Sequence, residues 1–258
     1  MKIATWNINS ITVRLPHVLD WVNRNRPDVL CLQEIKCKDE KFPADSFREL
    51  GYMTEVFGQP TYNGVATLSL APFNNVQKGF PGDVADAPRR LLDATINGAR
   101  IVNVYIPNGS EVGSDKYQFK LEWFDKLRKF FNECCDPGQP LVLCGDFNVA
   151  RKPIDVHPVL RKDMIGQTNP ERDLIDQVFS HGLVDLGRHV DPDNDRLFTW
   201  WAPWRNLRQR NIGWRLDYVA ASHALVDGAA TCKVYREVGT SDHAPVIAHL
   251  RDEPALVP

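Results

Sequence analysis

The 258-residue sequence lacks the features that mark several specialised classes of protein. It has six cysteines, none of them spaced as Cys-x-x-Cys and most of them inside apolar runs, so we expect no disulfide and no zinc site. No apolar run approaches the ~18 residues that cross a membrane. The sequence opens on a strand-like segment instead of a basic and then apolar leader, so we expect the mature chain to start at residue 1 and to have no membrane partner.

An excess of charge of one sign is also missing. Lys and Arg number 31 against 33 Asp and Glu, so the chain cannot bind a polyanion through its overall charge and would need a local basic surface to do so. The 43% of hydrophobic residues is typical of a folded globular chain. Because no linker-like or repeated stretch divides the sequence, we predict one domain over residues 1–258, with a tail at about 251–258.

Short apolar runs alternate with amphipathic stretches along the first half of the chain. The apolar runs are typical of buried strands, and the spacing of Leu121, Phe124, Leu127 and Phe131 is typical of a helix. The pattern predicts an α/β or α+β protein. The predicted strands are 3–6, 29–32, 65–70, 92–96, 101–106, 141–144, 215–221, 231–234 and 246–250; the predicted helices are 16–25, 116–132 and 170–180; segments 72–88 and 136–140 are rich in turn formers.

Polar side chains lie at the ends of five of these segments. Taken singly, each is better explained by an ordinary turn than by a functional site. Together, carboxylates and amides with one His and no Cys/His pattern describe an oxygen-rich site for a hard cation such as Mg²⁺, which suits phosphate chemistry. The residues concerned are Asn7, Asn9, Glu34, Asp146, Asn148, Asp217, Asp242 and His243.

Six short motifs carry a resemblance to a known family. They are NINS (7–10), LQEIK (32–36), VYIPNG (104–109), GDFNVA (145–150), WRLDY (214–218) and SDHAP (241–245). In this order and approximate spacing they resemble the exonuclease III family of apurinic/apyrimidinic (AP) endonucleases, and the resemblance covers nearly the whole chain. It implies a four-layer sandwich of two mixed β-sheets flanked by helices.

The resemblance implies a metal site built on three of the polar residues. Glu34 matches the Glu that holds the divalent metal, and Asp242 matches an acidic residue near the metal. Asn7 matches the Asn that braces the metal-binding and catalytic carboxylates. Asn9 stands where some relatives carry Asp, which removes one carboxylate from a possible second metal site.

The remaining motif residues match catalytic positions of the family. Asp146 matches the general base that activates water, and Asn148 positions water and phosphate. His243 matches the imidazole that contacts a phosphoryl oxygen, oriented by Asp217. Tyr105 is the last residue of an apolar run and, taken alone, is better explained as a core residue. In the resemblance it matches the Tyr that contacts phosphate, with Asn108 beside it.

Residues 196–215 form the local basic segment that the near-neutral charge requires. They contain five Arg, no acidic residue and four of the seven Trp. Cationic side chains neutralise phosphates and exposed aromatic rings stack on bases, but Trp is more often buried, so we expect Trp201 to lie in the core. The resemblance adds an apolar pocket for a flipped abasic sugar, with Trp200 in place of a smaller aromatic. The predicted nucleic-acid contacts are Asn108, Trp200, Trp204, Arg205, Arg208, Arg210, Trp214 and Leu216.

The function that the resemblance implies is DNA repair. We expect incision of duplex DNA on the 5′ side of abasic sites and 3′–5′ exonuclease or 3′-end trimming, with Mg²⁺ or in its place Mn²⁺. The expected partner is DNA with abasic sites or blocked 3′ ends, bound by a monomer in the cytoplasm, or at the nucleoid in a bacterium. Two alternatives stay open. A small-molecule or lipid phosphoesterase is disfavoured by the basic aromatic segment, and an inactive DNA-binding protein by the complete catalytic set.

Overall fold

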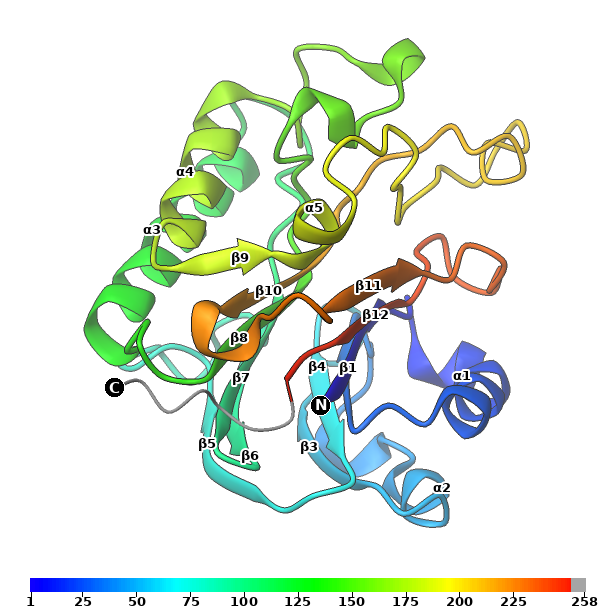
Figure 1. Ribbon diagram of the computed structural model, residues 1–258, viewed down its shortest axis with the longest axis vertical. Helices are drawn as coiled ribbons and strands as arrows, with labels where there is room; N and C mark the ends of the chain where they lie inside the picture. The colour runs from blue at the N-terminus through cyan, green and yellow to red at the C-terminus, as the bar shows by residue number, and fades with distance from the viewer. Residues whose placement is uncertain (252–258) are drawn as a thin grey trace.

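Two mixed six-stranded β-sheets pack face to face in the computed structural model, which describes residues 1–251 (Figure 1). The strand order is β11-β12-β1-β2-β4-β3 in the first sheet and β5-β6-β7-β8-β10-β9 in the second. β1 is parallel to β2, and β7 is parallel to β8. The strands are β1 (Lys2–Asn7), β2 (Val29–Gln33), β3 (Met53–Phe57), β4 (Val65–Ser69), β5 (Phe73–Lys78), β6 (Leu91–Ile96), β7 (Ala99–Tyr105), β8 (Leu141–Asp146), β9 (Leu183–Asp185), β10 (Asp217–Ser222), β11 (Thr231–Val234) and β12 (Val246–His249).

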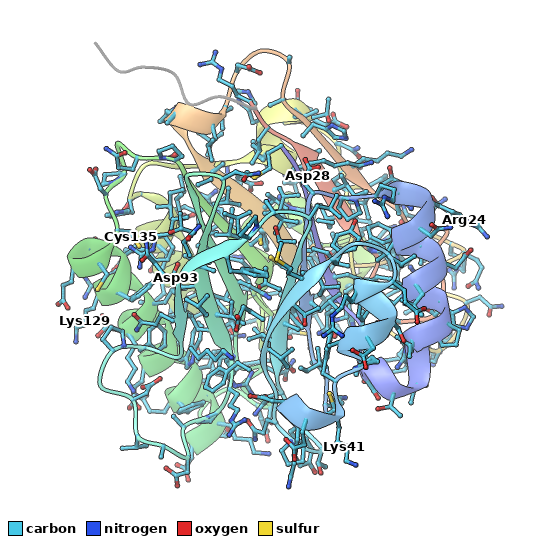
Figure 2. The ribbon with its side chains drawn as sticks, turned by 90° about the horizontal axis from the view of Figure 1, so that it is seen from below. Arg24, Asp28, Lys41, Asp93, Lys129 and Cys135 are labelled. Atoms are coloured by element: carbon cyan, nitrogen blue, oxygen red, sulfur yellow. The ribbon has the colours of Figure 1, made fainter. Side chains whose placement is uncertain are left out.

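Helices cover the outer face of each sheet (Figures 1 and 2). α1 and α2 pack on the first sheet, and α3 and α4 pack on the second. A third core cluster fills the space between the sheets, so the central strands are buried on both faces and their sequences are nearly continuous apolar runs. The helices are α1 (Ile11–Asn25), α2 (Ala44–Arg48), α3 (Asp115–Cys134), α4 (Asn169–Phe179) and α5 (Leu186–Val190). The predicted four-layer sandwich is confirmed.

All nine predicted strands are present, with ends within two residues of those expected. The helix predicted at 16–25 begins five residues earlier, because Ile11 is buried and its amide donates to the carbonyl of Ile35 (3.1 Å). Pro16, which favoured a start at that residue, lies inside α1. The strand predicted from Arg215 begins at Asp217, because the amide of Arg215 donates outside the sheet to the carbonyl of Asp155 (2.8 Å).

Five short elements were missed: β3, β5, β9, α2 and α5. β5 shows why. The segment 72–88 was expected to be turns, and this is wrong for its first part, since residues 73–78 form an edge strand. β5 is largely exposed, and its register shifts between Asn74 and Gln77, so its sequence shows no apolar alternation.

The described structure ends at Arg251, which is bonded to the fold. Most of the predicted tail, residues 252–258, lies outside the described residues. Arg251 is attached to the fold: its amide donates to the carbonyl of Leu225 (3.1 Å) and its guanidinium pairs with Asp227 (3.2 Å). Within residues 1–251, no helix combines the length and apolar character needed to cross a membrane. The six cysteines are free thiols.

Candidate active site

The polar side chains that follow the strands meet at one edge of the two sheets. Because β1 and β2 are parallel, as are β7 and β8, the carboxyl ends of each pair lie together. β10 is antiparallel to β8, so its first residue reaches the same edge, where Asp217 pairs in register with Asp146. The structure brings together eight predicted residues: Asn7, Glu34, Tyr105, Asp146, Asn148, Asp217, Asp242 and His243.

Asn7 joins the two sheets at the centre of this cluster. It is fully buried at the end of β1, and its Nδ2 donates to Glu34 Oε1 (2.8 Å) and to Asp146 Oδ2 (2.8 Å). Its Oδ1 accepts a hydrogen bond from the amide of Asn9 (3.0 Å). Asn7 therefore fixes the distance between a carboxylate of the first sheet and a carboxylate of the second; that these two carboxylates bind metal and act in catalysis stays a prediction.

Glu34 turns its carboxylate into the cluster through an unusual backbone conformation. Its φ of 51° is left-handed, which ends β2 abruptly and reorients the side chain. Lys36 Nζ lies 2.9 Å from Glu34 Oε2. Burial raises the pKa of Glu34. Hydrogen bonds from Asn7 and Lys36, with the charges of Lys36 and His243, lower the pKa by a larger amount, so that it lies below its usual value. Lys36 was missed as a site residue, although it lies two positions after Glu34 in the quoted motif.

Asp146, His243 and Asp217 form a buried row. His243 Nδ1 lies 2.9 Å from Asp217 Oδ2, and its Nε2 lies 3.7 Å from Asp146 Oδ2. Burial raises the pKa of Asp146 from 3.8 to about 7, with a smaller contribution from Asp217 and opposition from His243. Burial lowers the pKa of His243, but the charges of Asp217 and Asp146 outweigh this and raise it to about 10. The imidazole is therefore cationic at neutral pH.

Asp242, which precedes His243 in the sequence, receives hydrogen bonds from two predicted residues. Asn9 Nδ2 donates to Asp242 Oδ1 (3.2 Å), and the indole Nε1 of Trp200 donates to Oδ2 (3.0 Å). Burial raises the pKa of Asp242, but the charge of His243 and these hydrogen bonds lower the pKa by a larger amount. The net pKa lies below its usual value, so the carboxyl is ionised at neutral pH.

Tyr105 and the two predicted Asn residues complete the polar wall. Burial, and then the charges of Glu34 and Asp146, raise the pKa of Tyr105 well above its usual value, so the phenol keeps its proton. Asn148 donates its amide to Asp146 Oδ1 (2.9 Å) and accepts at Oδ1 from Asn108 (3.1 Å). Arg90, a residue that sequence reasoning missed, places its guanidinium 4.5 Å from the Tyr105 ring.

Two groups of side chains have the composition of a cation site. Asp146, Asp217 and His243 bring their ligand atoms within 4.8 Å of one another, but His243 Nδ1 and a carboxylate oxygen of Asp217 are already hydrogen-bonded to each other. Glu34 and Asp242 are partly exposed and line one cavity with carboxylate oxygens. Hard divalent cations prefer such oxygen donors, so Glu34 and Asp242 fit the predicted metal better.

A cavity of about 570 Å³ adjoins the polar cluster. Its lining includes polar residues, among them Glu34, Asp242 and His243, and a larger set of apolar residues. The rings of Trp200 and Trp214 meet edge to face with centroids 5.7 Å apart. The apolar lining residues are Leu160, Met164, Ile165, Trp200, Ala202, Trp204, Leu207, Trp214 and Leu216. Sequence reasoning missed the other apolar lining residues, which are Leu160, Met164, Ile165, Ala202 and Leu207. Contacts between separate loops leave no periodic signal in the sequence.

The basic aromatic segment is divided between the surface and the interior. Trp201 is 1% exposed, which confirms the expectation that it lies in the core, whereas Trp204 is 59% exposed at the cavity rim. Arg205 and Arg210 are exposed. Arg208 is instead bonded within the protein: its guanidinium donates to the backbone carbonyls of residues 236, 238 and 241 and lies over the Trp201 ring.

Comparison with known proteins assigns this arrangement to a family. A model of the endonuclease/exonuclease/phosphatase family matches residues 4–243. The chain belongs to this family. Among its relatives, the DNA repair nuclease APEX1 of Danio rerio is 34% identical, and the match covers 97% of this chain and 82% of the relative. The exodeoxyribonuclease of Bacillus subtilis (strain 168) is 30% identical, and that match covers 95% of this chain and 98% of the relative.

Solved structures agree with the family assignment. The 3′ phosphatase NExo from Neisseria bound to a product DNA hairpin has a TM-score of 0.90 and 37% identity, and an AP endonuclease from Archaeoglobus fulgidus has a TM-score of 0.89 and 34% identity. Each match covers 97% of this chain and 99% of the other. The chain is therefore a DNA-repair nuclease of the exonuclease III type within the endonuclease/exonuclease/phosphatase family.

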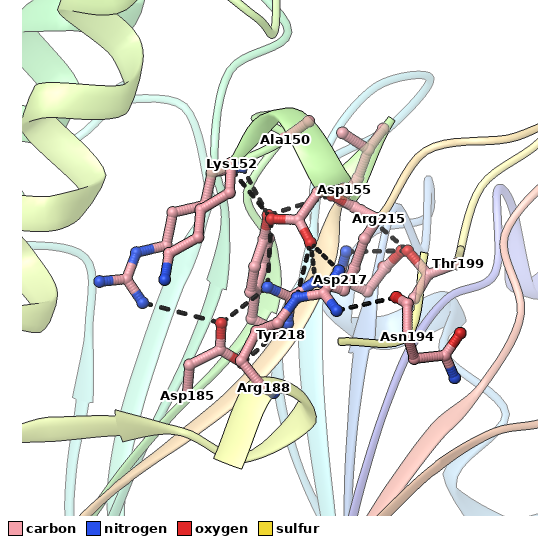
Figure 3. Close-up of polar contacts among 12 residues, drawn as sticks. Ala150, Lys152, Asp155, Asp185, Arg188, Asn194, Thr199, Arg215, Asp217 and Tyr218 are labelled. Atoms are coloured by element: carbon pink, nitrogen blue, oxygen red, sulfur yellow. Dashed lines mark hydrogen bonds and ion pairs between the residues drawn. The ribbon is translucent and has the colours of Figure 1, made fainter. Parts of the chain in front are cut away.

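A buried charge network supports the pocket wall of this family member (Figure 3). Arg215, between Trp214 and Leu216, was expected to add to a basic surface, and this is wrong: it is 2% exposed. Its guanidinium is bonded to Asp155 (2.8 Å) and to Asp185 (2.7 Å). An isolated buried guanidinium is costly, so these carboxylates fix Arg215, and through it the two neighbouring wall residues.

Thr199 binds the backbone of Leu216 and Asp217, the residues that follow Arg215. Its Oγ1 accepts the amides of Leu216 (2.9 Å) and Asp217 (3.0 Å), and its own amide donates to the carbonyl of Trp214 (2.8 Å). Trp214 and Leu216 of the pocket wall and the carboxylate of Asp217, which bonds His243, therefore belong to one continuous segment, residues 214–217, that Thr199 holds in place.

Proposed function

We propose that this nuclease incises duplex DNA on the 5′ side of abasic sites and trims blocked 3′ ends, using Mg²⁺ or Mn²⁺. The observation that carries the proposal is the continuity of the cavity: a polar cluster suited to a phosphodiester adjoins an apolar, aromatic wall suited to a sugar without a base. Because one chain supplies every side chain of the cluster, we propose that it acts as a monomer, in the compartment that holds the DNA.

In this proposal Asp146 is the general base. Because its pKa is raised to about 7, Asp146 is ionised in a substantial fraction of the molecules near neutral pH, and the carboxylate is basic enough to take a proton from water. The resulting hydroxide attacks phosphorus, and the bond between phosphorus and the 3′ oxygen breaks. The products are a 3′ hydroxyl and a 5′ phosphate on the abasic sugar.

Other side chains stabilise the charge that develops on the phosphate. His243 is cationic and oriented by Asp217, so its Nε2 donates to a phosphoryl oxygen. Tyr105 keeps its proton and donates a second hydrogen bond, and Asn148, held by Asn108, positions water and phosphate. Glu34 and Asp242, braced by Asn7 and Asn9, would hold the divalent cation, which when bound neutralises phosphoryl oxygens.

The exposed residues of the basic segment would contact the duplex. Arg205 and Arg210 are free to neutralise phosphates, and Trp204 stands at the rim with its ring exposed. Trp200, Trp214 and Leu216 would contact the extruded sugar. For Arg208 the contact is proposed only through its position beside the cavity, because its donors are engaged with backbone carbonyls.

A panel of defined substrates tests the proposal. The purified chain is incubated with Mg²⁺ and with a duplex holding a stable abasic analogue, a duplex ending in a 3′ phosphate, an undamaged recessed duplex and an activated phosphodiester without DNA. We expect abasic incision and 3′-phosphate removal to exceed the other reactions. Hydrolysis of only the small phosphodiester supports the phosphoesterase alternative, and binding of DNA without cleavage under any condition supports the inactive alternative.

Trp214→Ala tests the sugar pocket separately. Losing an aromatic contact costs about 1–3 kcal/mol in nucleic-acid binding, so abasic incision should fall roughly 5- to 150-fold while hydrolysis of the activated phosphodiester is retained. If Trp214 serves only the core, both reactions fall together with the melting temperature, since removing a core Trp costs about 3–5 kcal/mol.

A further inference from the structure

A fully buried ion pair lies beneath the cavity, outside the catalytic cluster. Lys120 of α3 and Glu171 of α4 are both 0% exposed, and Nζ lies 2.5 Å from Oε1. Lys and Glu are almost never buried to this extent, and apolar side chains would join two helices as well or better. Joining α3 to α4 therefore does not explain why the pair is charged, and the other hydrogen bonds of Lys120 and Glu171 indicate its role.

The ammonium holds one wall of the cavity. Lys120 Nζ donates to the backbone carbonyls of Asn108 (3.1 Å) and Asn148 (2.8 Å). The side chains of these two residues are bonded to each other and line the cavity, and Asn148 also bonds Asp146 through its amide. One cation therefore fixes the two loops that follow β7 and β8.

The carboxylate holds a second segment that lines the cavity. Glu171 accepts the amide of Gly166 (2.8 Å) and both the amide and the hydroxyl of Thr168 (3.0 and 2.8 Å). Gly166 has a φ of +80° and lies against Trp214, where an added Cβ would stand 2.9 Å from the indole. Ile165, next to Gly166, also lines the cavity.

The two walls touch directly beside the ion pair. A Cβ added at Gly109, which follows Asn108, would lie 2.8 Å from the Ile165 side chain and 3.1 Å from that of Lys120. The loops are thus in close contact. Two polar links tie their backbones together: the hydrogen bond from the amide of Ala150 to the carbonyl of Gly166 (2.8 Å), and the ion pair with its own hydrogen bonds to both loops.

We propose that Lys120 and Glu171 act as a positioning clamp that sets the separation between the Asn108/Asn148 wall and the Gly166 wall, and so determines how firmly the extruded sugar is held. The inference rests on the proposed incision at abasic sites. Asn148, whose amide bonds Asp146, is the point where the clamp reaches the catalytic row. Asp146 is also held by Asn7 and by its strand, and His243 by Asp217, so loss of the clamp affects substrate positioning more than the chemistry at Asp146 and His243.

The decisive variant is the double substitution Lys120→Met with Glu171→Gln. It removes both charges at similar volume, so it recovers stability that either single substitution loses through an unpaired buried charge. The loop hydrogen bonds stay weakened. We expect kcat/KM for abasic incision to fall about 10- to 100-fold, mainly through KM, because small misplacements of a bound substrate have effects of this size. Hydrolysis of the activated phosphodiester should be retained.

Two further measurements accompany the variant. Lys129→Met breaks an exposed ion pair with Asp125 on the same helix and is the matched control, expected to leave both reactions unchanged. Amide hydrogen exchange at Gly166 and Thr168 should accelerate in the double variant, while exchange at Asn148, whose amide bonds Asp146, changes less.

The outcomes separate the clamp from a purely structural ion pair. Recovery of abasic incision together with the melting temperature in the double variant would overturn the clamp. If the double variant does not fold, Glu171→Gln alone decides: a raised KM and faster exchange at Gly166 support the clamp, and an unchanged KM overturns it. A wild-type chain that fails to incise the abasic duplex contradicts the proposed function instead, and the exchange rates then decide on the clamp.

Discussion

At the scale of single residues, the site depends on carboxylates that differ in environment more than in position. Asp146 and Glu34 share one donor, Asn7, but only Glu34 also has an ammonium group at 2.9 Å. Their pKa values consequently move in opposite directions, above the usual value for Asp146 and below it for Glu34. The raised pKa suits a proton acceptor, and the lowered pKa suits a group that stays anionic beside a cation.

Asp146→Asn tests this division of roles. The substitution keeps the shape and most hydrogen bonds but removes the proton acceptor, so cleavage under single-turnover conditions should slow by roughly 10²–10⁴. Affinity for an abasic duplex, measured by fluorescence anisotropy, should change little. Weak binding with normal single-turnover cleavage would show that Asp146 acts in binding and not as the base.

Residue by residue, the sequence predicted the cluster better than the pocket. Motif residues such as Glu34 and His243 occupy strand ends, and a strand end has a defined place at the sheet edge. Lys36 and Arg90 were missed because their roles depend on which side chains face them across the fold. Arg215 was counted in the basic segment, and Arg208 was predicted to contact DNA, because charge alone does not distinguish a solvated guanidinium from one bonded internally.

At the scale of elements, short turns carry buried charges that anchor the pocket. Asp155, at the end of a single 3₁₀ turn, is fully buried and accepts hydrogen bonds from Arg188 and Arg215. Burial raises the pKa of Asp155, but the charges and hydrogen bonds of the two guanidinium groups outweigh it, so that the pKa lies below 3.8. The lowered pKa belongs to the folded state, so the ionised carboxylate stabilises the fold above the unfolded value and this contribution is lost as pH falls through the folded pKa.

Asp155→Asn should therefore act on stability in a pH-dependent way. At pH 7 it leaves two buried guanidinium groups short of a partner and should cost roughly 3–5 kcal/mol of unfolding free energy. The difference from wild type should start to shrink as the pH falls below about 4, where Asp155 of the unfolded wild-type chain takes up a proton, and should be lost as the pH falls through the lower pKa of the folded state. Urea denaturation at several pH values measures this. Asp45→Asn, in an exposed pair with Arg48, is the control and should show little effect. A difference that stays constant with pH would contradict the assignment.

Elements with strong local signals were predicted, and elements set by tertiary contacts were not. α4 begins where Thr168 and Glu171 form a capping box, and β8 is a continuous apolar run. β5 and β9 lie at the edges of the second sheet and are short or exposed, so their strands depend on a neighbour that offers hydrogen bonds. The same holds for α1, whose first turn depends on a core contact of Ile11.

At the scale of the whole molecule, the site is built from both sheets. Glu34 and Asp242 belong to the first sheet and its loops, whereas Asp146 and Asp217 belong to the second, and Asn7 spans the boundary. Carboxylates gathered in one place repel one another in the metal-free protein, and Lys36 and His243 offset only part of that charge. A cation bound to the first-sheet carboxylates would relieve the repulsion and stabilise the folded state as a whole.

Mg²⁺ should therefore raise the melting temperature of the chain by mass action, because it binds the folded site and not the unfolded chain. At a concentration about 100 times its dissociation constant, such a ligand adds about 2.7 kcal/mol to the free energy of unfolding. Glu34→Gln keeps the side-chain shape but removes the charged ligand, so the Mg²⁺-dependent rise should largely disappear. Glu55→Gln, on β3 in a surface pair with Lys78, is the matched control and should keep the full rise. Calorimetry with EDTA and with increasing Mg²⁺ distinguishes the cases: an equal rise in both variants would place the cation elsewhere and remove Glu34 as its ligand.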